Sequence, residues 1–448
     1  MGLSLDAKLT ALRQIIGVAS DEALGRLDPL LDGLPGSGII EIRRVIFAEL
    51  EDRRFRDAVF APLAPMFKPR SDGVASSHFR ASLLAALWAD LKAREPDWVE
   101  EARLAAIARN DELSPPQFDT LCHKAAAVLR DAEFCSRLRV DEEAGESLAA
   151  FLELSHLARS AVRKLPEWLT KATDERAAAV KLVLKDAAAL MPDGAARLFE
   201  IALAHISDAH QILRLMALAV DRASDRFLAQ SELASFGARL LDDLDVRVKR
   251  LEKFDPQGGA DAGGRAARDV LVACATLNEF AQTLNLGRDG PWGSRATSAR
   301  KRMVAAVEAR LKDVEPAVNL ALPLQTVRIA GRMTRPAPRL NADLDPAAAE
   351  RARALCALLE HVRLTAAAGG YGALRNQVAE KITERLSVYA DEVLHLINSG
   401  EIDDPARALA HLELAAQLLA WAKDEQAAQF IRRRAAVAGE PRRSQDVA

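Results

Sequence analysis

Two pairs of side chains have the spacing of a helical metal site. Glu153 and His156 are three residues apart, and so are Glu392 and His395. Residues three apart lie on one face of a helix, so each pair could offer a carboxylate and an imidazole to one metal ion, as in carboxylate-bridged di-iron bundles. The two pairs are far apart in the chain, however, and a chain with 8 His forms such pairs by chance. We therefore interpret them as solvated helix faces and predict neither a metal site nor a cofactor.

Other residue combinations form no catalytic motif. His205 and His210 are five residues apart, whereas two imidazoles reach one metal ion from positions i and i+4 of a helix. Cys122 and His123 are adjacent, so they point to different helix faces and cannot act together as nucleophile and base. No Gly-x-Ser-x-Gly sequence marks a hydrolase nucleophile. The sequence therefore favours a protein without enzymatic activity, although catalytic groups can converge from distant helices without a local motif.

Three glycine-rich clusters have part of the pattern of a phosphate-binding loop. They lie at residues 33–38, 258–264 and 369–372. A helix N-terminus after such a loop can bind an anion. None of the clusters follows a predicted strand, and none continues into the Lys-Ser/Thr of a P-loop. We therefore predict that all three interrupt helices and that residues 255–264 form a loop.

The clearest charge signal lies between Arg288 and Arg339. Glycine and proline open this segment, a basic run predicted to be helical follows, and a Pro- and Arg-rich crossing closes it. Eleven basic and four acidic residues leave an excess of seven positive charges, whereas the whole chain has a formal net charge of -3. Such a patch attracts phosphate, an acidic protein or an anionic lipid. Alternatively, its arginines pair with carboxylates of neighbouring helices, for instance Asp242, Asp243 and Asp245, and we favour this interpretation because guanidinium groups form such pairs well.

Trp292 stands beside these bases in the glycine- and proline-rich turn. Tryptophan and arginine are common at the centre of protein interfaces, so Trp292 could anchor a partner. It could equally fill a gap between helical bundles, and we favour that interpretation. The candidate binding residues are Trp292, Arg295, Arg300, Lys301, Arg302, Arg328, Arg332, Arg335 and Arg339.

The composition predicts an all-α protein. Hydrophobic residues make up 50% of the chain and charged residues 28%, as in soluble globular proteins. Ala and Leu, which favour helices, supply most of the apolar content, and runs of β-branched residues are scarce. Weakly similar helices recur, but without a constant period. We therefore predict irregular helical bundles or an α-solenoid-like array with little or no sheet.

Breaks in the helical pattern divide the chain into regions. We predict a bundle of short helices at residues 1–141 and a bundle of longer helices at residues 142–255. A C-terminal helical domain with the basic crossing is predicted at residues 265–438. Residues 439–448 are rich in arginine and polar residues and are predicted to form a disordered tail.

The cysteines favour a reducing compartment. Cys122, Cys135, Cys274 and Cys356 form neither a Cys-x-x-Cys pair nor a zinc-binding spacing. The first residues lack the pattern of a signal peptide. No apolar run reaches the ~18–20 residues that cross a bilayer. We therefore expect a cytoplasmic protein.

Taken with the absence of a catalytic motif, the long helical chain favours a non-enzymatic scaffold or adaptor that binds another protein through helical surfaces. Two alternatives stay open. The first is a regulator that binds an anion (nucleic acid, a nucleotide or an acidic membrane surface) through residues 288–339. The second is a helical enzyme whose pocket carries no sequence motif. The sequence determines neither the oligomeric state nor the identity of a partner.

Overall fold

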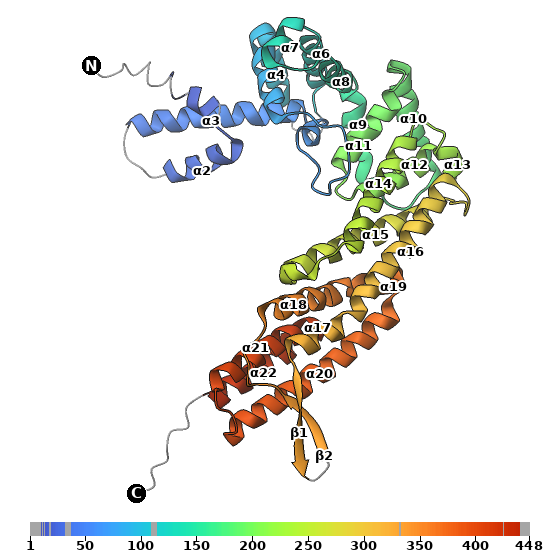
Figure 1. Cartoon of the computed structure of the whole chain (residues 1–448). Helices are drawn as coiled ribbons and strands as arrows, with labels where there is room; N and C mark the ends of the chain where they lie inside the picture. The colour runs from blue at the N-terminus through green and yellow to red at the C-terminus, as the bar shows by residue number, and fades with distance from the viewer. Residues whose placement is uncertain are drawn as a thin grey trace. The chain divides into compact units, whose positions relative to one another are not determined.

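The computed structural model describes residues 10, 12, 14–17, 19–31, 37–108, 114–330, 333–423 and 425–439. Contacts divide the chain into two units, Met1–Asp221 and Arg222–Ala448, which we name the N-terminal and the C-terminal unit. Both consist of helices, and the sheet found among the described residues is a two-stranded hairpin in the C-terminal unit (Figure 1). The prediction of an all-α protein with little sheet is confirmed.

The N-terminal unit is built from helices of short and medium length. Its α-helices are α2 (Asp21–Leu31), α3 (Ser37–Val59), α4 (Ala81–Arg94), α5 (Pro96–Ala108), α6 (Gln117–Leu129), α7 (Ala132–Leu138), α8 (Glu142–Glu153), α9 (Ser155–Trp168), α10 (Asp174–Leu190), α11 (Gly194–His205) and α12 (Ile212–Ala219). Two 3-10 helices, η1 (Ala64–Phe67) and η2 (Ala209–Gln211), lie between them.

The C-terminal unit holds the longest helices and the hairpin. Its α-helices are α13 (Asp225–Leu228), α14 (Ala234–Glu252), α15 (Gly259–Thr283), α16 (Pro291–Lys312), α17 (Val314–Ala321), α18 (Pro346–His361), α19 (Ala366–Gly369), α20 (Gly372–Ser399), α21 (Pro405–Ala422) and α22 (Glu425–Gly439). The strands are β1 (Leu324–Ala330) and β2 (Met333–Pro338), and the 3-10 helices are η3 (Pro256–Gly258) and η4 (Val362–Thr365). Within the described residues of the chain, no helix has the length and apolar character needed to cross a membrane.

Aromatic rings form part of the core of the N-terminal unit. Phe55 of α3 makes edge contacts with Trp88 of α4 and Phe118 of α6, with ring centroids 5.7 and 5.6 Å apart. Asp52, on the preceding turn of α3, accepts hydrogen bonds from Nε1 of Trp88 and from Arg103 of α5, among others. Burial acts to raise the pKa of Asp52, but the hydrogen bonds to its carboxylate outweigh burial and lower the pKa. Apolar and polar contacts therefore hold α3, α4, α5 and α6 together.

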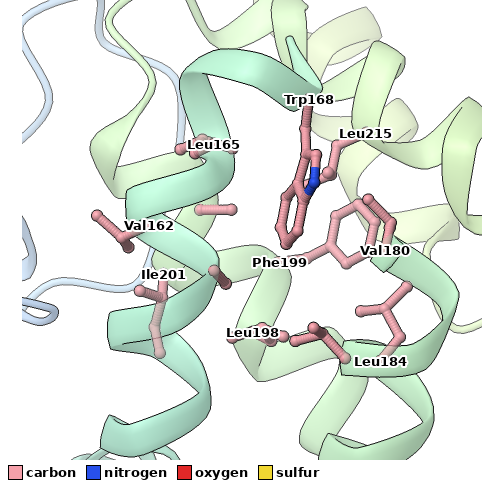
Figure 2. A pocket seen from close by; sticks show the side chains of 12 residues that line it. Val162, Leu165, Trp168, Val180, Leu184, Leu198, Phe199, Ile201 and Leu215 are labelled. Carbon is pink, nitrogen blue, oxygen red and sulfur yellow. The ribbon is translucent and has the colours of Figure 1, made fainter. Parts of the chain in front are cut away.

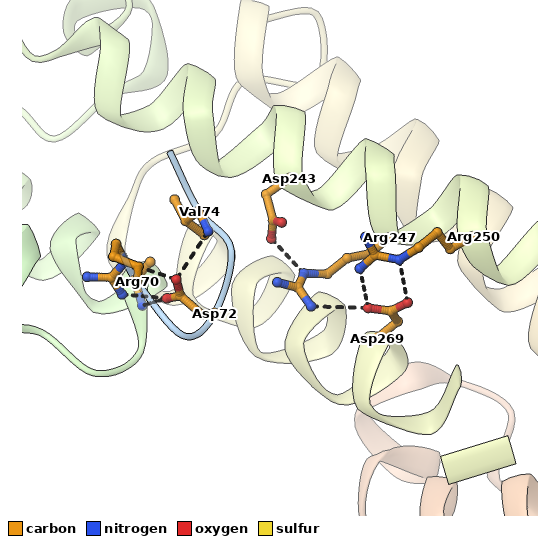
Figure 3. A network of polar contacts seen from close by, with 8 residues as sticks. Arg70, Asp72, Val74, Asp243, Arg247, Arg250 and Asp269 are labelled. Carbon is orange, nitrogen blue, oxygen red and sulfur yellow. Dashed lines mark hydrogen bonds and ion pairs between the residues drawn. The ribbon is translucent and has the colours of Figure 1, made fainter. Parts of the chain in front are cut away.

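The loop after η1 is closed by an ion pair between Arg70 and Asp72 (Figure 3). Asp72 also accepts the backbone N–H of Val74 at 3.1 Å and that of Ala209 at 3.3 Å. Burial acts to raise the pKa of Asp72, but the hydrogen bond from Arg70 and its positive charge lower it. These contacts tie the loop to the start of η2, far along the chain.

Local capping signals in the sequence start and stop several helices. Asp345 accepts the backbone N–H of Ala347 at 3.0 Å before α18, and Asp404 accepts that of Arg407 at 3.1 Å before α21. The proline that follows each aspartate occupies the first helical position, where no N–H is needed. Helix α20 ends before Gly400, whose φ of 75° is left-handed.

Helices α15 and α18 pack closely because glycine allows their backbones to approach. A β-carbon at Gly263 would lie 2.1 Å from the carbonyl oxygen of Ala354. Helix α15 begins at Gly259, and only residues 256–258 before it form the short η3. The predicted loop at residues 255–264 is therefore wrong. Glycine lowers helix propensity, but here the packing that it permits against α18 outweighs that cost.

The division into two units places its boundary at residues 221/222. The sequence predicts boundaries near residues 141 and 255, and neither coincides with this division. Helices α6 and α8 pack together across residue 141, and α14 and α15 pack together across residue 255. Residues 440–448 of the predicted tail lie outside the described residues.

An ion network joins α14 to α15 (Figure 3). Arg247, which is 7% exposed, pairs with Asp243 of its own helix at 2.6 Å and with Asp269 of α15 at 3.1 Å. Arg250 pairs with the same Asp269 carboxylate at 2.6 Å. A largely buried network of this kind fixes the register of two helices more than it adds stability.

The hairpin lies between α17 and α18 in the chain and extends away from the helices of the C-terminal unit (Figure 1). Its strands are antiparallel, with Leu324 opposite Pro338 and Val327 opposite Arg335. The regular pairing ends at a bulge after Arg328. These residues belong to the Pro- and Arg-rich crossing, for which the sequence predicts no strand.

Candidate interaction surface

Glycines surround a buried carboxylate in the turn before Trp292. Asp225, which is 3% exposed, accepts the backbone N–H groups of Gly287 and Gly293, each at 3.3 Å. A β-carbon at Gly290 would lie 1.8 Å from Oδ2 of Asp225, so this position must lack a side chain. Gly290 is the N-cap of α16 and offers no capping side chain, so Asp225 supplies the capping carboxylate from elsewhere in the chain. This turn therefore serves to begin α16.

Trp292 is buried inside the C-terminal unit. Its side chain is 5% exposed and makes an edge contact with Phe280 of α15, with ring centroids 6.1 Å apart. Its indole also lies against Gly237 of α14. Trp292 thus fills the space between α14, α15 and α16 of the C-terminal unit.

Two of the candidate arginines on α16 pair with carboxylates of α14. Arg295 lies 2.8 Å from both Asp242 and Asp245, and Arg302 lies 2.8 Å from Glu252. The hydrogen bond from Arg302 lowers the pKa of Glu252, and the hydrogen bond to Asp245 raises the pKa of Arg295. This internal pairing engages two of the eleven basic residues that give the segment its positive charge.

Two further candidate residues are engaged with polar partners inside the C-terminal unit. Arg300 donates hydrogen bonds to the side chain of Asn278 at 3.3 Å and to the carbonyl oxygen of Ala368 at 3.2 Å. Arg335 of β2 forms an ion pair with Glu392 of α20 at 3.0 Å. The arginine of β2 therefore links the hairpin to α20.

The remaining candidate residues face solvent where the structure describes them. Lys301 and Arg328 are exposed and form no ion pair with another described residue. Arg339 is exposed and donates a hydrogen bond to Asn341 at 3.3 Å. Arg332 lies outside the described residues. The eight candidate residues that the structure describes are therefore not brought together into one positive site.

The two Glu-x-x-His pairs lie in different units and have other partners. Glu153 pairs with Arg130 at 2.5 Å, and Glu392 pairs with Arg335. In the part of the chain that the structure describes, no group of three or more His, Cys, Asp or Glu side chains could hold a metal ion.

The four cysteines are free, and their surroundings disfavour the thiolate. Cys122, Cys274 and Cys356 are buried, and Cys135 is half-buried. Burial raises the pKa of Cys122 and of Cys356 to about 12. Because the thiolate is the nucleophile and the metal ligand, these side chains serve as packing residues.

A small cavity lies between α9, α10 and α11 in the N-terminal unit (Figure 2). Its volume is about 20 Å³, and apolar side chains such as Trp168, Val180 and Phe199 line it. This volume is enough for about one water molecule, but the lining offers no set of polar partners to hold it. The cavity is therefore a gap in the packing and too small for a substrate.

An open groove lies between the hairpin, α17 and α20 in the C-terminal unit, and we name it the hairpin groove. Its volume is about 380 Å³. Leu324 of β1, Pro336 and Pro338 of β2, and Val388 and Tyr389 of α20 give it an apolar lining. Leu324 is 41% and Val388 63% exposed, so both apolar side chains are open to a partner.

Charged side chains border this apolar lining. Glu315 of α17 pairs with Lys381 of α20 at 3.4 Å, on the rim of the groove. Glu384 and Glu392 of α20 also line it. The hairpin groove therefore combines exposed apolar surface with charges of both signs, which suits contact with a protein surface.

The base of the hairpin is fixed on both sides. Arg385 of α20 donates a hydrogen bond at 2.9 Å to the carbonyl oxygen of Leu322, where α17 ends and β1 follows. Beyond β2, the carbonyl oxygen of Ala342 lies 3.4 Å from Nε2 of His411. The hydroxyl of Tyr389 donates a hydrogen bond to Nδ1 of the same His411 at 2.8 Å. Nε2 therefore carries the imidazole proton and donates a hydrogen bond to the carbonyl oxygen of Ala342. The hairpin is thus held firmly at its base while its strands remain accessible.

The sequence contains a signal for this hairpin that the helical interpretation passes over. Residues 324–329 include the β-branched Thr326, Val327 and Ile329, which favour a strand. Prolines at alternate positions, Pro336 and Pro338, are compatible with an edge strand as well as with a loop. No local pattern could place Val388 or Tyr389 beside them, because that depends on how α20 packs.

Comparisons of the chain with protein-family models, with curated proteins and with solved structures find no match. What the surface can bind is therefore inferred from its own residues.

Proposed function

We propose that the chain is an adaptor that binds another protein through the hairpin and the hairpin groove of the C-terminal unit. The observation that carries this proposal is the placement of β1 and β2 beyond the helices on a fixed base. Leu324 and Val327 of β1 are 41% and 37% exposed although they are large and apolar. A rigid support beneath an exposed strand limits the conformational entropy that binding costs.

The charge of the hairpin favours a protein partner that carries acidic residues. No acidic residue lies between Glu315 and Asp343, and the described strands and the residue that follows them carry Arg328, Arg335 and Arg339. Complementary charge accelerates association and selects among partners more than it adds affinity. Apolar contact in the hairpin groove supplies the complementary attraction.

The alternative of a polyanion such as nucleic acid has less support. Arg295 and Arg302 of α16 already pair with carboxylates of α14. The hairpin groove also presents Glu384, whose negative charge opposes a phosphate backbone. Exposed apolar side chains beside the basic strands suit a protein better than a polyanion.

A site-specific crosslink tests the adaptor proposal. A photoreactive amino acid replaces Val327 in the full-length chain, and the same group replaces Leu182 of α10, which is 60% exposed, in a control chain. Both are irradiated in an extract of the source cells, and the adducts are identified by mass spectrometry. The proposal expects a discrete protein adduct at position 327 that is absent at position 182. No adduct at 327, or the same adducts at both positions, would contradict it.

A further inference from the structure

The hydrogen-bond pattern of the hairpin can be assigned residue by residue. Arg339 donates its backbone N–H to the carbonyl oxygen of Pro323 at 3.0 Å, so these two residues form a hydrogen-bonded pair. In an antiparallel ladder, hydrogen-bonded and non-hydrogen-bonded pairs alternate. With Leu324 opposite Pro338, the next hydrogen-bonded pair is Gln325 with Ala337.

Continuing the alternation along the register places Val327 opposite Arg335 in a hydrogen-bonded pair and Thr326 opposite Pro336 in a non-hydrogen-bonded one. Residues of non-hydrogen-bonded pairs direct their main-chain N–H and C=O groups away from the partner strand. On β1 these outward-directed residues are Leu324, Thr326 and Arg328. The prolines of β2 fit this assignment, because their missing N–H costs the ladder nothing.

The two edges of the hairpin are therefore different. On β2 the outward positions are Thr334, Pro336 and Pro338, of which the two prolines have no N–H to donate, and β2 packs against α20. On β1 the outward positions Leu324, Thr326 and Arg328 keep both groups. Within the described residues, no hydrogen bond joins the main chain of these three residues to another part of the protein. An unpaired edge of this kind is a template for another strand.

We propose that β1 accepts an extended, acidic segment of a partner protein as a third strand of the sheet. This inference rests on the proposed adaptor function and names the partner chemistry and the contact. Main-chain hydrogen bonds to Leu324, Thr326 and Arg328 supply the affinity, as in other complexes formed by strand addition. Selectivity comes from the side chains that flank the added strand.

Charge decides between an acidic partner and a second copy of this chain. Arg328 is exposed and forms no ion pair with another described residue, so an acidic side chain beside it on the added strand gains a cross-strand charge pair. Pairing of β1 with the β1 of a second copy would bring together two strands that each carry Arg328 and no acid. Like charges across strands are destabilising, so the acidic partner is favoured.

The pleat of the sheet also defines what the added strand presents to the groove. Leu324 lies on the same face as Pro336 and Pro338, and all three line the hairpin groove. Alternate residues of the added strand lie on that face. We therefore expect an apolar residue beside Leu324, at the side of the groove where Val388 is exposed, and an acidic residue beside Arg328.

Binding of model peptides to the full-length chain tests the proposal. The probe is a fluorescent peptide of β-branched residues with Val and Glu four residues apart, so that both lie on one face beside Leu324 and Arg328, and its counterpart carries Lys in place of Glu. Fluorescence anisotropy at low salt should show severalfold tighter binding of the Glu peptide, because the counterpart replaces a favourable charge pair with a repulsive one. Arg328→Glu should reverse this preference. Equal binding of the two peptides to the wild-type chain would overturn the assignment of an acidic partner.

The edge itself is tested at position 326. Thr326→Pro removes an outward N–H without removing a ladder bond, and the extended backbone of Gln325 tolerates a following proline. This variant should bind the Glu peptide at least tenfold more weakly, whereas Thr326→Val, which keeps the N–H, should bind as the wild type does. Unchanged binding by Thr326→Pro would overturn strand addition. Trypsin cleavage at Arg328 serves as the folding check, and its rate should match that of the wild type if the hairpin is intact.

Two further outcomes separate this inference from its alternatives. Sedimentation that shows a wild-type dimer, lost in Thr326→Pro, would assign the edge to a second copy and overturn the acidic partner. If the photoreactive group at residue 327 captures a partner and Thr326→Pro leaves that capture unchanged, the adaptor proposal stands and strand addition fails. If no adduct forms at 327 while the Glu peptide binds as expected, the adaptor proposal fails instead.

Discussion

The indole ring of Trp292 occupies the space that a side chain at Gly237 would need. A β-carbon at residue 237 would lie 2.5 Å from both Cη2 and Cζ2 of Trp292. Gly237 is on α14 and Trp292 begins α16, so the contact sets how closely these two helices approach. A tryptophan that the sequence offers as an anchor for a partner is thus used to join helices of the same unit.

This contact predicts a coupled effect on stability. Gly237→Ala should lower the free energy of unfolding by about 1–3 kcal/mol through overpacking, and Trp292→Ala by about 3–5 kcal/mol through loss of the buried ring. The double variant should lose less than the sum, because the methyl group added at residue 237 no longer meets an indole. Urea denaturation followed by circular dichroism measures all three. Strictly additive losses would show that the two residues do not share this space.

Adjacent glycines in α15 offer a matched pair of substitutions. A β-carbon at Gly263 would lie 2.1 Å from the carbonyl oxygen of Ala354, whereas one at Gly264 would meet nothing within 4 Å. Gly263→Ala should therefore destabilise the C-terminal unit, because the backbone of α18 must move away. Gly264→Ala should stabilise it by about 0.5–1 kcal/mol, since alanine favours a helix interior. Thermal unfolding of the two variants checks the opposite signs, and a shift in the same direction for both would contradict the packing of α15 on α18.

These glycines also show where the sequence stops being informative. Asp345 and Asp404 indicate helix starts by local capping, and Gly400 indicates a helix end. Such features can be predicted from a few neighbouring residues. The local sequence at Gly263 resembles that of a helix break. Gly263 lies within a helix because Ala354 of the distant helix α18 packs closely against it.

The candidate surface has the same limit. Arginine partners for Asp242 and Asp245 can be anticipated from opposite charge. The hairpin groove cannot be anticipated from the sequence, because it forms where β2 meets α20.

Burial of His411 predicts a loss of stability in mild acid. Its side chain is 1% exposed, and burial lowers its pKa. The unfolded chain therefore takes up a proton at this residue below roughly pH 6.5, where the folded state does not. The stability that the neutral His411 contributes is fully present above that pH. It is lost as the pH falls toward the pKa of His411 in the folded state, which is the lower of the two. Urea unfolding at pH 7.5 and 5.5 measures the difference.

Substitution at residue 411 isolates this contribution. His411→Gln removes the titrating group and should reduce the difference between the two pH values, although it lowers stability at both. Burial also lowers the pKa of His205 in the N-terminal unit, so His205→Gln together with His411→Gln should reduce the difference further. A pH difference as large as in the wild type would mean that neither imidazole is held neutral in the folded protein.

Amide hydrogen exchange along β1 should alternate residue by residue. The N–H groups of Gln325 and Val327 point toward β2 and should exchange slowly, whereas those of Thr326 and Arg328 point outward and should exchange rapidly. Exchange read by mass spectrometry with fragmentation at single residues measures this pattern. The opposite alternation would direct Thr326 toward β2 and Pro336 into the ladder, where its missing N–H would leave the carbonyl of its partner unpaired. Because the same assignment leaves β1 as the open edge, slow exchange at Thr326 in the unbound chain would also remove the donor on which strand addition depends. Protection that appears at Thr326 only when the Glu peptide is present would identify that N–H as the group the added strand uses.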